Sequence, residues 1–574
     1  MNANKQFHEK ADAPMDHSSP SRGRALLGVA LLMLAVPAWA NDASPHAAPP
    51  QLPAIIDPGA QRERTREGLL ERERERERER EAEERREDVD PVEAPPGPHG
   101  GNLPEADDAF MLLDIRFSDS VFLEPAFLET VAAGYIGRSV TFSELNRMLA
   151  RINERYRERG LVTAAAYIPP QTIGADGVLQ VELLEGRLGR LYLEGLEYTS
   201  RGYLHDRLPL ATGEVIDVPT LRQAIQRINR HTALALQADI RPGDETGESD
   251  ITITVAEPPR YSVQTFIDNA GSENTGEWRG GLITVLNGPF RRADRLTAYG
   301  VYARGSRNGV LQYEVPVNRW GGRVDLTHSE GRIRVIDGPF EELNITGKSK
   351  ATAIALHQPF YAGPRGIASA RVGYSVSQST SEIDGVAISD FDIDETELRL
   401  DWSGGTGERR WRINQGVVHA DVEALDAASE TFKRYPGSAS WLQWFSQRWA
   451  ARLQLGWQYT SEDALPSSLV YQLGGATTVR GYEEGVVSGA KGYRASLNVD
   501  YHWRPGLRQT LFMDHGEVDQ GVSGREDLNS VGTGINWRPT SDLDLDLNLG
   551  IPLDDVVPDQ DDYRFHVRLT WVAL

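Results

Sequence analysis

The 574-residue sequence predicts a multi-domain protein in which two small α/β modules precede a transmembrane antiparallel β-barrel. Three observations support this fold class. Apolar and polar residues alternate with period two through much of residues 259–574, as they do in strands with one apolar and one polar face. Two earlier stretches share one order of expected strands and helices. The N-terminal region carries the pattern of an export signal.

The composition restricts the classes of partner. The chain has 61 Lys and Arg against 84 Asp and Glu, a formal net charge of −23 and no cysteine. Because nucleic acid is a polyanion and the sequence has no basic stripe, we expect no nucleic-acid partner. An exported chain without cysteine must fold without disulfides.

Residues 1–40 have the features of a signal peptide. Arg22 and Arg24 precede the apolar run 25–36, and an Ala-x-Ala cleavage site ends at Ala40. The run is too short to span a bilayer as a helix. Later stretches never approach the roughly 18 apolar residues of a transmembrane helix, so membrane insertion must use β-strands.

Residues 41–107 are expected to link the signal peptide to the first module. Residues 41–58 are rich in Pro and Ala and should be extended. Glu and Arg then alternate within the charged segment 61–88, which as a helix would have no apolar face. A solvated helix and a disordered segment both fit this pattern. A second linker rich in Pro and Gly, 91–103, follows.

The first module, residues 108–186, is expected to fold in the order β-α-α-β-β. Residues 111–117 form its first strand, and Pro125 opens a short helix. Thr141 and Glu144 form a capping box at the start of a longer helix. The apolar face of that helix is Leu145, Met148, Leu149, Ile152 and Tyr156. The last two strands are residues 161–168 and 177–184.

The second module, residues 187–258, repeats this order more compactly. Residues 191–193 begin it, Asp217 caps a helix, and strands 233–240 and 250–255 complete it. Each module leaves a sheet edge that an extended partner could join through main-chain hydrogen bonds. A role as a mere spacer also fits the sequence.

Residues 259–574 contain alternating segments of about 8 to 12 residues separated by turn residues. In residues 543–549 leucines alternate with Asp and Asn. Carboxylates behind a row of leucines cannot form an ordinary core, because burying ionised carboxylates without partners is costly. A barrel of about 14 to 18 strands resolves this conflict, because the leucines then face lipid on the outside and the carboxylates face water on the inside. Tryptophans suited to interfacial girdles are Trp402, Trp441, Trp444, Trp449, Trp457, Trp503 and Trp571.

The loop 477–485, Thr-Thr-Val-Arg-Gly-Tyr-Glu-Glu-Gly, lies between two alternating segments, 452–459 and 493–503. Its arginine stands on a glycine-rich turn next to strands whose polar face could line a barrel. The alternative is an ordinary surface charge on a loop.

Three groups of residues resemble motifs of one transporter family. The first group resembles the first polypeptide-transport-associated (POTRA) domain of that family, and its residues are Tyr156, Gly160, Pro169, Pro170, Gln171, Gly177, Glu185 and Gly186. The VRG[YF] motif of a loop folded into the barrel is matched by Val479, Arg480, Gly481 and Tyr482. The F-x-D motif of a barrel strand is matched by Phe512 and Asp514, which period two places on one face. From about residue 50 onward, the chain resembles the two-partner secretion (TpsB) transporters of the haemolysin and filamentous-haemagglutinin type.

The resemblance implies a 16-stranded barrel in the outer membrane of a Gram-negative bacterium, with two POTRA domains in the periplasm. It implies that Arg480 pairs with Asp514 across the lumen, and that a helix in the place of residues 61–88 plugs the pore at rest. The family usually ends in an aromatic residue that barrel-assembly machinery recognises. This chain ends in Leu574, and Trp571 could serve instead.

The implied function is export of one unfolded exoprotein, recognised through its N-terminal secretion domain by the POTRA domains. The expected partners are this TpsA-type exoprotein, outer-membrane lipid and, during biogenesis, barrel-assembly machinery. We expect no enzymatic activity, catalytic residue, cofactor or metal, because HExxH and GxSxG motifs are absent and the 12 histidines are scattered. The alternatives are a related barrel-assembly insertase, which typically has more POTRA domains, and a passive porin, which needs none.

Overall fold

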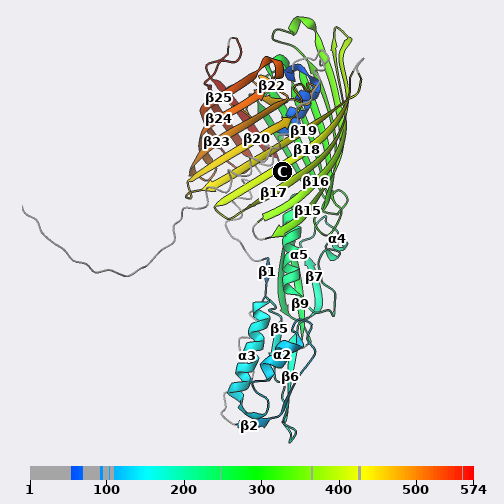
Figure 1. The fold of residues 1–574 in the computed structure, drawn as a ribbon, viewed down its shortest axis with the longest axis vertical. Helices are drawn as coiled ribbons and strands as arrows, with labels where there is room; N and C mark the ends of the chain where they lie inside the picture. The colour runs from blue at the N-terminus through cyan, green and yellow to red at the C-terminus, as the bar shows by residue number, and fades with distance from the viewer. Residues whose placement is uncertain are drawn as a thin grey trace, which may run out of the picture. The chain divides into compact units, whose positions relative to one another are not determined.

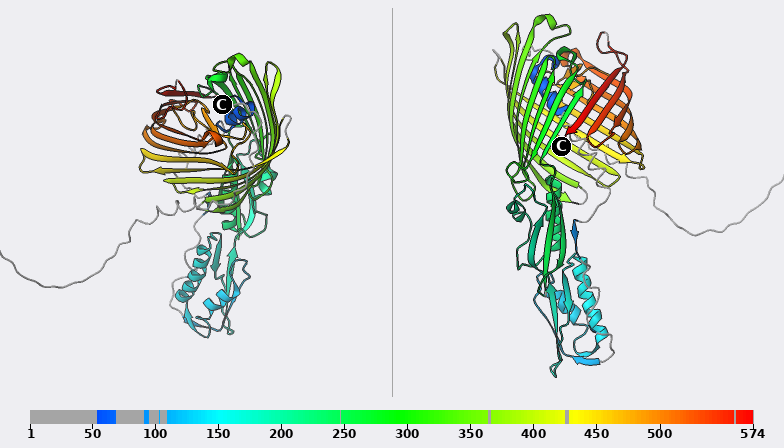
Figure 2. Two further views of the ribbon diagram at one scale, coloured as in Figure 1. Left: turned by 45° about the horizontal axis from the view of Figure 1, so that its top comes forward. Right: turned by 180° about the vertical axis from the view of Figure 1, so that it is seen from behind.

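The computed structural model describes residues 54–68, 91–94, 103, 109–245, 247–363, 366–424, 428–558 and 560–573. The predicted signal peptide, residues 69–88 of the charged segment and the terminal Leu574 lie outside these ranges. Within the ranges, no helix combines the length and the apolar character needed to cross a bilayer. The described chain contains two small α/β modules and a closed barrel, and a short helix lies within the barrel (Figures 1 and 2).

The first module has the predicted order of elements with an additional strand pair. Its elements are β2 (Ala109–Leu112), β3 (Asp114–Phe117), α2 (Pro125–Ala132), β4 (Arg138–Thr141), α3 (Phe142–Glu158), β5 (Ala164–Tyr167) and β6 (Val178–Glu185). The sheet order is β3-β6-β5, and β2 pairs separately with β4. The single strand predicted at 111–117 is therefore wrong. The chain breaks at Leu113, whose N–H donates to the carbonyl of Gly177 at 2.8 Å.

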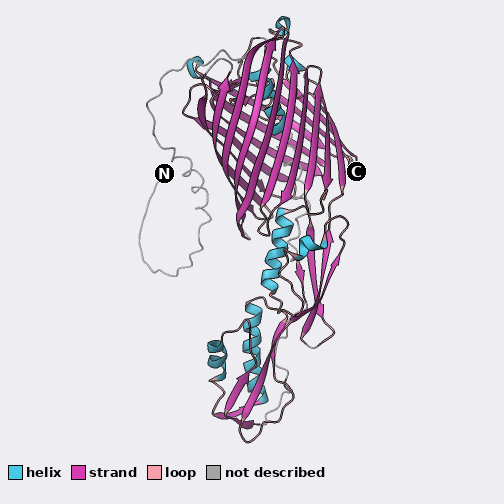
Figure 3. Ribbon diagram, turned by 90° about the vertical axis from the view of Figure 1, so that its right-hand side faces the viewer, coloured by secondary structure: helices cyan, strands magenta, loops and turns pink. Residues whose placement is uncertain are grey.

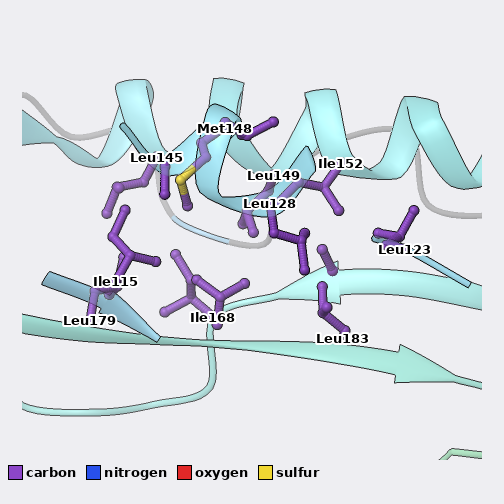
Figure 4. Close-up of a cluster of buried hydrophobic side chains, with 14 of the residues drawn as sticks. Ile115, Leu123, Leu128, Leu145, Met148, Leu149, Ile152, Ile168, Leu179 and Leu183 are labelled. Atoms are coloured by element: carbon purple, nitrogen blue, oxygen red, sulfur yellow. The ribbon is translucent and has the colours of Figure 1, made fainter. Parts of the chain in front are cut away.

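Helix α3 covers the sheet of this module because its start and its apolar face are both encoded locally. The N–H of Glu144 donates to Thr141 Oγ1 at 3.3 Å, and the N–H of Thr141 donates to Glu144 Oε2 at 3.0 Å, which confirms the capping box. All five predicted apolar residues of the helix are fully buried. Figure 4 shows several of them packed against strand residues Ile115, Leu179 and Leu183.

The second module contains β7 (Arg187–Glu194), α4 (Arg201–His205), α5 (Val218–His231), β8 (Ala235–Pro242) and β9 (Glu248–Ala256). Its sheet has the order β1-β8-β9-β7, in which β1 (Val92–Glu93) pairs parallel with β8. The prediction that 91–103 is only a linker is therefore wrong at its start. Two residues carry almost no periodic signal, so β1 could not be foreseen. Helix α4, capped by Ser200, was also not predicted.

Sixteen further strands form a closed antiparallel barrel (Figure 3). They are β10 (Tyr261–Asp268), β11 (Arg279–Asn287), β12 (Arg295–Ala303), β13 (Ser306–Pro316), β14 (Arg323–Arg334), β15 (Ile345–Gly363), β16 (Gly366–Ile383), β17 (Val386–Gly405), β18 (Arg409–Ala424), β19 (Glu430–Trp444), β20 (Trp449–Thr460), β23 (Lys491–Arg504), β24 (Leu507–Asp519), β25 (Arg525–Trp537), β26 (Leu543–Pro552) and β27 (Arg564–Ala573). Pairing of β10 with β27 closes the barrel, and we call this pairing the seam.

The predicted division into an apolar outer face and a polar inner face is confirmed. On β24 the side chains of Leu511 and Met513 are 57% and 58% exposed, whereas Phe512 and Asp514 are buried. On β26, inward Asp544 accepts a hydrogen bond from Asn536 Nδ2 at 2.9 Å. Several of the predicted girdle tryptophans are exposed on the outside: Trp402, Trp441, Trp449, Trp503 and Trp571.

The N-terminal described segment folds rather than extending. Residues 54–56 form a 3-10 turn in which Ile56 is fully buried against Val335 and Ile345. A helix begins at Pro58 and covers the described residues to Gly68, surrounded by barrel strands in Figures 1 and 2. The prediction of an extended linker through residue 58 is therefore wrong at its end.

Candidate functional site

An inward loop (residues 461–490) joins β20 to β23 and carries the arginine motif. Two short strands, β21 (Tyr471–Leu473) and β22 (Val487–Gly489), brace it. Its apolar residues form a buried cluster with two barrel strands: Leu473, Val479, Tyr482, Val487, Val518 and Leu528. The loop is therefore a packed part of the barrel interior and not a surface excursion.

Arg480 and Asp514 meet at the centre of this region, as predicted. The guanidinium donates from Nε to Asp514 Oδ2 at 2.7 Å and from Nη2 to Oδ1 at 2.6 Å. Nη2 also donates to Ser496 Oγ at 3.1 Å and to Asn498 Oδ1 at 3.0 Å. The side chain of Asp514 is fully buried. A planar guanidinium suits such bidentate binding, and Ser496 and Asn498 supply further acceptors for Nη2.

The aromatic residue of the F-x-D motif completes the contact. The Arg480 guanidinium carbon lies 3.5 Å from the centroid of the Phe512 ring, a cation–π geometry. The ring packs against Gly532, the residue opposite it on β25, where an added Cβ would come within 2.2 Å of the ring. The motif thus joins a loop, a strand and a glycine on the next strand.

The other loop-motif residues hold the loop tip against the barrel wall. Gly481 has a φ of 106°, which favours glycine, and an added Cβ would lie 3.1 Å from the backbone of Gly550 on β26. The hydroxyl of Tyr482 donates to the carbonyls of Asn529 at 2.8 Å and Asp554 at 3.2 Å. The tip can approach this closely only because glycine stands on both sides.

A second contact of the same composition lies at the seam and was missed in the sequence. Arg568 on β27 donates from Nη1 to Asp268 Oδ2 at 3.0 Å, and its guanidinium lies 3.7 Å from the Phe266 ring centroid. Phe266 again covers a glycine, Gly281, directly opposite on the next strand. Arg279 also donates to Asp268, from Nε at 2.8 Å. Repetition of the Phe-x-Asp pattern was the signal that could have found this site.

The short helix in the barrel is held at its start by the inner wall. Asp57 caps it by accepting the N–H of Ala60 at 2.7 Å. Ser349 Oγ on β15 donates to the carbonyl of Pro58 at 3.0 Å, and the N–H of Gly59 donates to Ser379 Oγ on β16 at 3.1 Å. This end of the helix is therefore bonded to two adjacent strands.

Further along, the same helix contacts the inward loop. Arg64 Nη1 donates to the carbonyl of Glu484 at 3.4 Å, and an added Cβ at Gly485 would clash with the Arg64 guanidinium at 2.5 Å. Arg66 pairs with Glu63 one turn back, with Nε donating to Oε2 at 3.1 Å. The contact to Glu484 places an arginine of the helix next to the loop motif itself.

The POTRA-motif residues cluster around the end of α3. The Tyr156 hydroxyl donates to Glu185 Oε1 at 3.0 Å, and the same carboxylate accepts from Ser120 Oγ at 2.6 Å and from the N–H of Val121 at 2.8 Å. Burial raises the pKa of Tyr156, which keeps its hydroxyl a donor. Gly160, with a φ of 72°, ends the helix.

The other POTRA-motif residues shape turns. The Gln171 side chain pairs with the backbone of Gln180, donating at 2.7 Å and accepting at 2.9 Å, while Pro169 accepts from it and Pro170 is exposed. Gly177 has a φ of 58° and its carbonyl accepts from β3.

Gly186 joins the two modules. Its N–H donates to Thr163 at 3.1 Å, and its carbonyl accepts from Ile216 at 2.9 Å. Among the described residues, no three His, Cys, Asp or Glu side chains are grouped as metal ligands would be.

A closed barrel with an inward loop, preceded by a POTRA domain, is the architecture of an outer-membrane protein whose POTRA domains lie in the periplasm. The model of the haemolysin secretion/activation protein family ShlB/FhaC/HecB matches residues 247–538, and the ShlB-type POTRA domain matches residues 110–186. The chain belongs to this family, and it is a transporter of the two-partner secretion class.

Individual relatives agree with this assignment. The chain is 23% identical over 480 residues to the heme/hemopexin transporter protein HuxB of Haemophilus influenzae, covering 77% of this chain and 83% of HuxB. It is 25% identical over 425 residues to the outer membrane transporter CdiB of Dickeya dadantii, covering 70% and 75%. The solved structure of CdiB from Escherichia coli superimposes with a TM-score of 0.67 at 19% identity, covering 92% of this chain and 100% of that one.

Proposed function

We propose that this transporter binds the N-terminal secretion domain of one TpsA-type exoprotein with its periplasmic modules and passes the exoprotein, unfolded, through the barrel to the cell surface. The observation that carries the proposal is the Arg480–Asp514 contact, which anchors an interior loop in a chain of this family. The loop narrows the lumen, so a passing chain must move along it.

The interior suits an unfolded polypeptide because charged and polar side chains line the wall beside the apolar cluster that holds the loop. Buried ion pairs line it at Arg452–Asp500, Arg279–Asp268 and Arg480–Asp514. Polar and charged side chains on the wall can exchange hydrogen bonds with a passing backbone, whereas an apolar wall could not. The sequence has no GxxxxGK phosphate loop, and folding of the exoprotein outside the cell supplies the direction of transport.

The helix that begins at Pro58 serves as the resting plug in this proposal. Its bonds to Ser349 and Ser379 and its contact with Glu484 support this role. Transport then requires those contacts to break, which couples plug release to the inward loop. The barrel is inserted by barrel-assembly machinery, for which Trp571 near the C-terminus is the outward aromatic residue. Transport needs no catalytic group, and we propose none.

Expression of this chain with each TpsA-type exoprotein encoded in the same genome tests the proposal. The host should lack both proteins, and the exoprotein should be assayed in the medium, on the surface and in the periplasm. We expect export only with the transporter present. Export without it would refute the proposal. A general defect in other outer-membrane barrels on its removal would indicate an insertase, and solute leakage without export would indicate a porin.

A further inference from the structure

Strand β1 occupies an edge of the second module that is otherwise open to an extended chain. The N–H of Ala238 on β8 donates to the carbonyl of Pro91 at 2.8 Å, and Val92 and Glu93 lie beside Ala238 and Asp239 in parallel register. Val92 is 5% exposed and is part of the hydrophobic core of the module. A segment from before the first module therefore completes the sheet of the second one.

The two modules present equivalent edges, marked by the same asparagine. In α5, Asn229 binds both backbone groups of Leu236 on β8: the N–H donates to Oδ1 at 2.7 Å, and Nδ2 donates to the carbonyl at 2.9 Å. In α3, Asn153 binds Ala166 on β5 in the same way, at 2.6 Å and 3.3 Å. An Arg-Ile-Asn sequence precedes both contacts in the chain.

Beyond the asparagine the two edges differ. Two residues after Leu236 comes Ala238, which binds β1, and two residues later comes Ile240. In the first module, the residue four positions after Ala166 is Pro170, which has no N–H to donate. The edge of β8 therefore continues where the edge of β5 is stopped by proline.

We infer that the β8 edge is the site at which the second module binds an extended segment of the exported protein, and that this segment displaces β1 from the edge when it binds. This inference rests on the proposed function and adds where the partner docks. A two-residue strand is short enough to be exchanged, because a longer partner strand makes more main-chain hydrogen bonds on the same edge.

The geometry defines the chemistry of the partner segment. It must run parallel to β8 and place one aliphatic side chain where Val92 enters the core, with the side chains on either side of it pointing away from the core, as those of Pro91 and Glu93 do now. Asn229 limits pairing on one side and Pro242, which lacks an N–H, limits it on the other. Beyond Pro242 a cleft of about 370 Å³ between β8, Gly186 and Val162 leaves room for the segment to continue.

A disulfide that holds β1 in place tests the inference. The chain has no cysteine, so Glu93→Cys with Asp239→Cys creates one defined pair. Adjacent strands lie about 4.8 Å apart, within the span of a disulfide, and the periplasm is oxidising. The probe is the purified N-terminal domain of the exoprotein that the export assay identifies, bound to the full-length transporter in detergent. We expect the oxidised transporter to bind it at least about tenfold more weakly than the reduced one.

Two variants complete the design. Gln237→Cys with Thr254→Cys crosslinks β8 to β9 instead, so it introduces a disulfide into the same sheet while leaving the outer edge free. Its oxidation should not change binding. Val92→Asp weakens the docking of β1, because it would bury a carboxylate, and should strengthen binding of the probe by about threefold or more.

Each outcome decides the inference. Equal binding by the oxidised and reduced forms of the β1–β8 crosslink would overturn it. So would weaker binding by the Val92→Asp variant, because that result would make β1 part of the binding surface. If the unmodified transporter binds and exports the exoprotein while the crosslink has no effect, only this inference fails. If the unmodified transporter does neither, the proposed function fails.

Discussion

At the scale of single residues, two arginines make the same set of contacts at two separate places in the barrel. Arg480 and Arg568 each bind a buried aspartate and stack on a phenylalanine two residues before it. A guanidinium combines a fork for the carboxylate with a flat face for the ring, which lysine cannot do. One arginine anchors the inward loop, and the other lies on the seam.

Removal of Arg480 should abolish most export while the barrel remains in the membrane. Arg480→Ala leaves Asp514 buried without its charged partner, which costs on the order of 3 to 5 kcal/mol if the site stays dry. The loop would then leave the wall, while the barrel ladder stays intact. Secretion assays, with heat-modifiable gel mobility as the test of barrel folding, measure both effects. Normal export by this variant would disprove the assigned role.

His231 makes the second module sensitive to acid. Its ring lies against the turn at Gly321, and burial, followed by the charges of Arg323 and Arg230, lowers its pKa to about 4. Since the ordinary pKa is 6.5, the unfolded form binds more protons between the two values. The contribution of buried, neutral His231 to the free energy of unfolding is therefore fully present above pH 6.5. Up to ~3 kcal/mol of it is lost as the pH falls to 4.

Hydrogen exchange of α5 and the Gly321 turn, corrected for intrinsic rates, measures this effect in the full-length protein. His231→Gln, which does not titrate, should show the same protection at about pH 4 and at about pH 7, the two ends of the transition. If the protection of His231→Gln falls with pH as much as that of the unsubstituted protein, the loss of stability belongs to another titrating group.

At the scale of elements, the helix in the barrel is placed by close backbone approach. Gly59 packs against the wall, where an added Cβ would lie 3.0 Å from both Ser379 Oγ and Ser468 Cβ. Gly68, on the same helix, has no atom within 4 Å of an added Cβ. The two glycines therefore provide a matched pair for testing whether this helix closes the pore.

Gly59→Leu should dislodge the start of the helix and raise the ion conductance of the transporter in planar bilayers, several-fold if the helix is the main obstruction. Deletion of residues 61–88 should raise conductance at least as much. Gly68→Leu should leave conductance unchanged, because it meets open space. Equal conductance in all of these proteins would show that the helix is not a plug.

At the scale of the whole molecule, the seam is the shortest part of the barrel wall. Strands β10 and β27 pair over residues 263–268, whereas β20 and β23 pair over residues 449–458. Fewer ladder bonds close the barrel there, so side chains must contribute more. Arg568, Asp268 and Arg279 supply an ion-pair cluster at that position.

Arg568→Ala should lower the temperature at which the barrel unfolds in detergent. Asp268 keeps Arg279, so we expect a loss of about 1 to 3 kcal/mol rather than the full value for a broken buried pair. Arg452→Ala removes a similar buried pair with Asp500 on the longer β20–β23 ladder and serves as the control. A larger loss in the control would contradict a special role for the seam.

Prediction from the sequence succeeded where the signal is local. The capping box of Thr141 and Glu144, the apolar face of α3 and the inward placement of Phe512 with Asp514 each depend on residues a few positions apart. It failed at β1, β4 and α4, which are too short for a periodic pattern. The glycines opposite Phe512 and Phe266 were also not foreseen, because their position follows from strand register.

The sequence by itself determined the two modules, the barrel and the alternation of outward and inward residues along its strands, and the family resemblance added one pairing, Arg480 with Asp514. Only the tertiary structure decided that Arg568 meets Asp268, 300 residues away, and that Val92 completes the sheet of the second module. The physical reason is that period and capping act over one or two turns of chain. Register, barrel closure and edge occupancy depend on which distant segments share a ladder, and no local pattern encodes that choice.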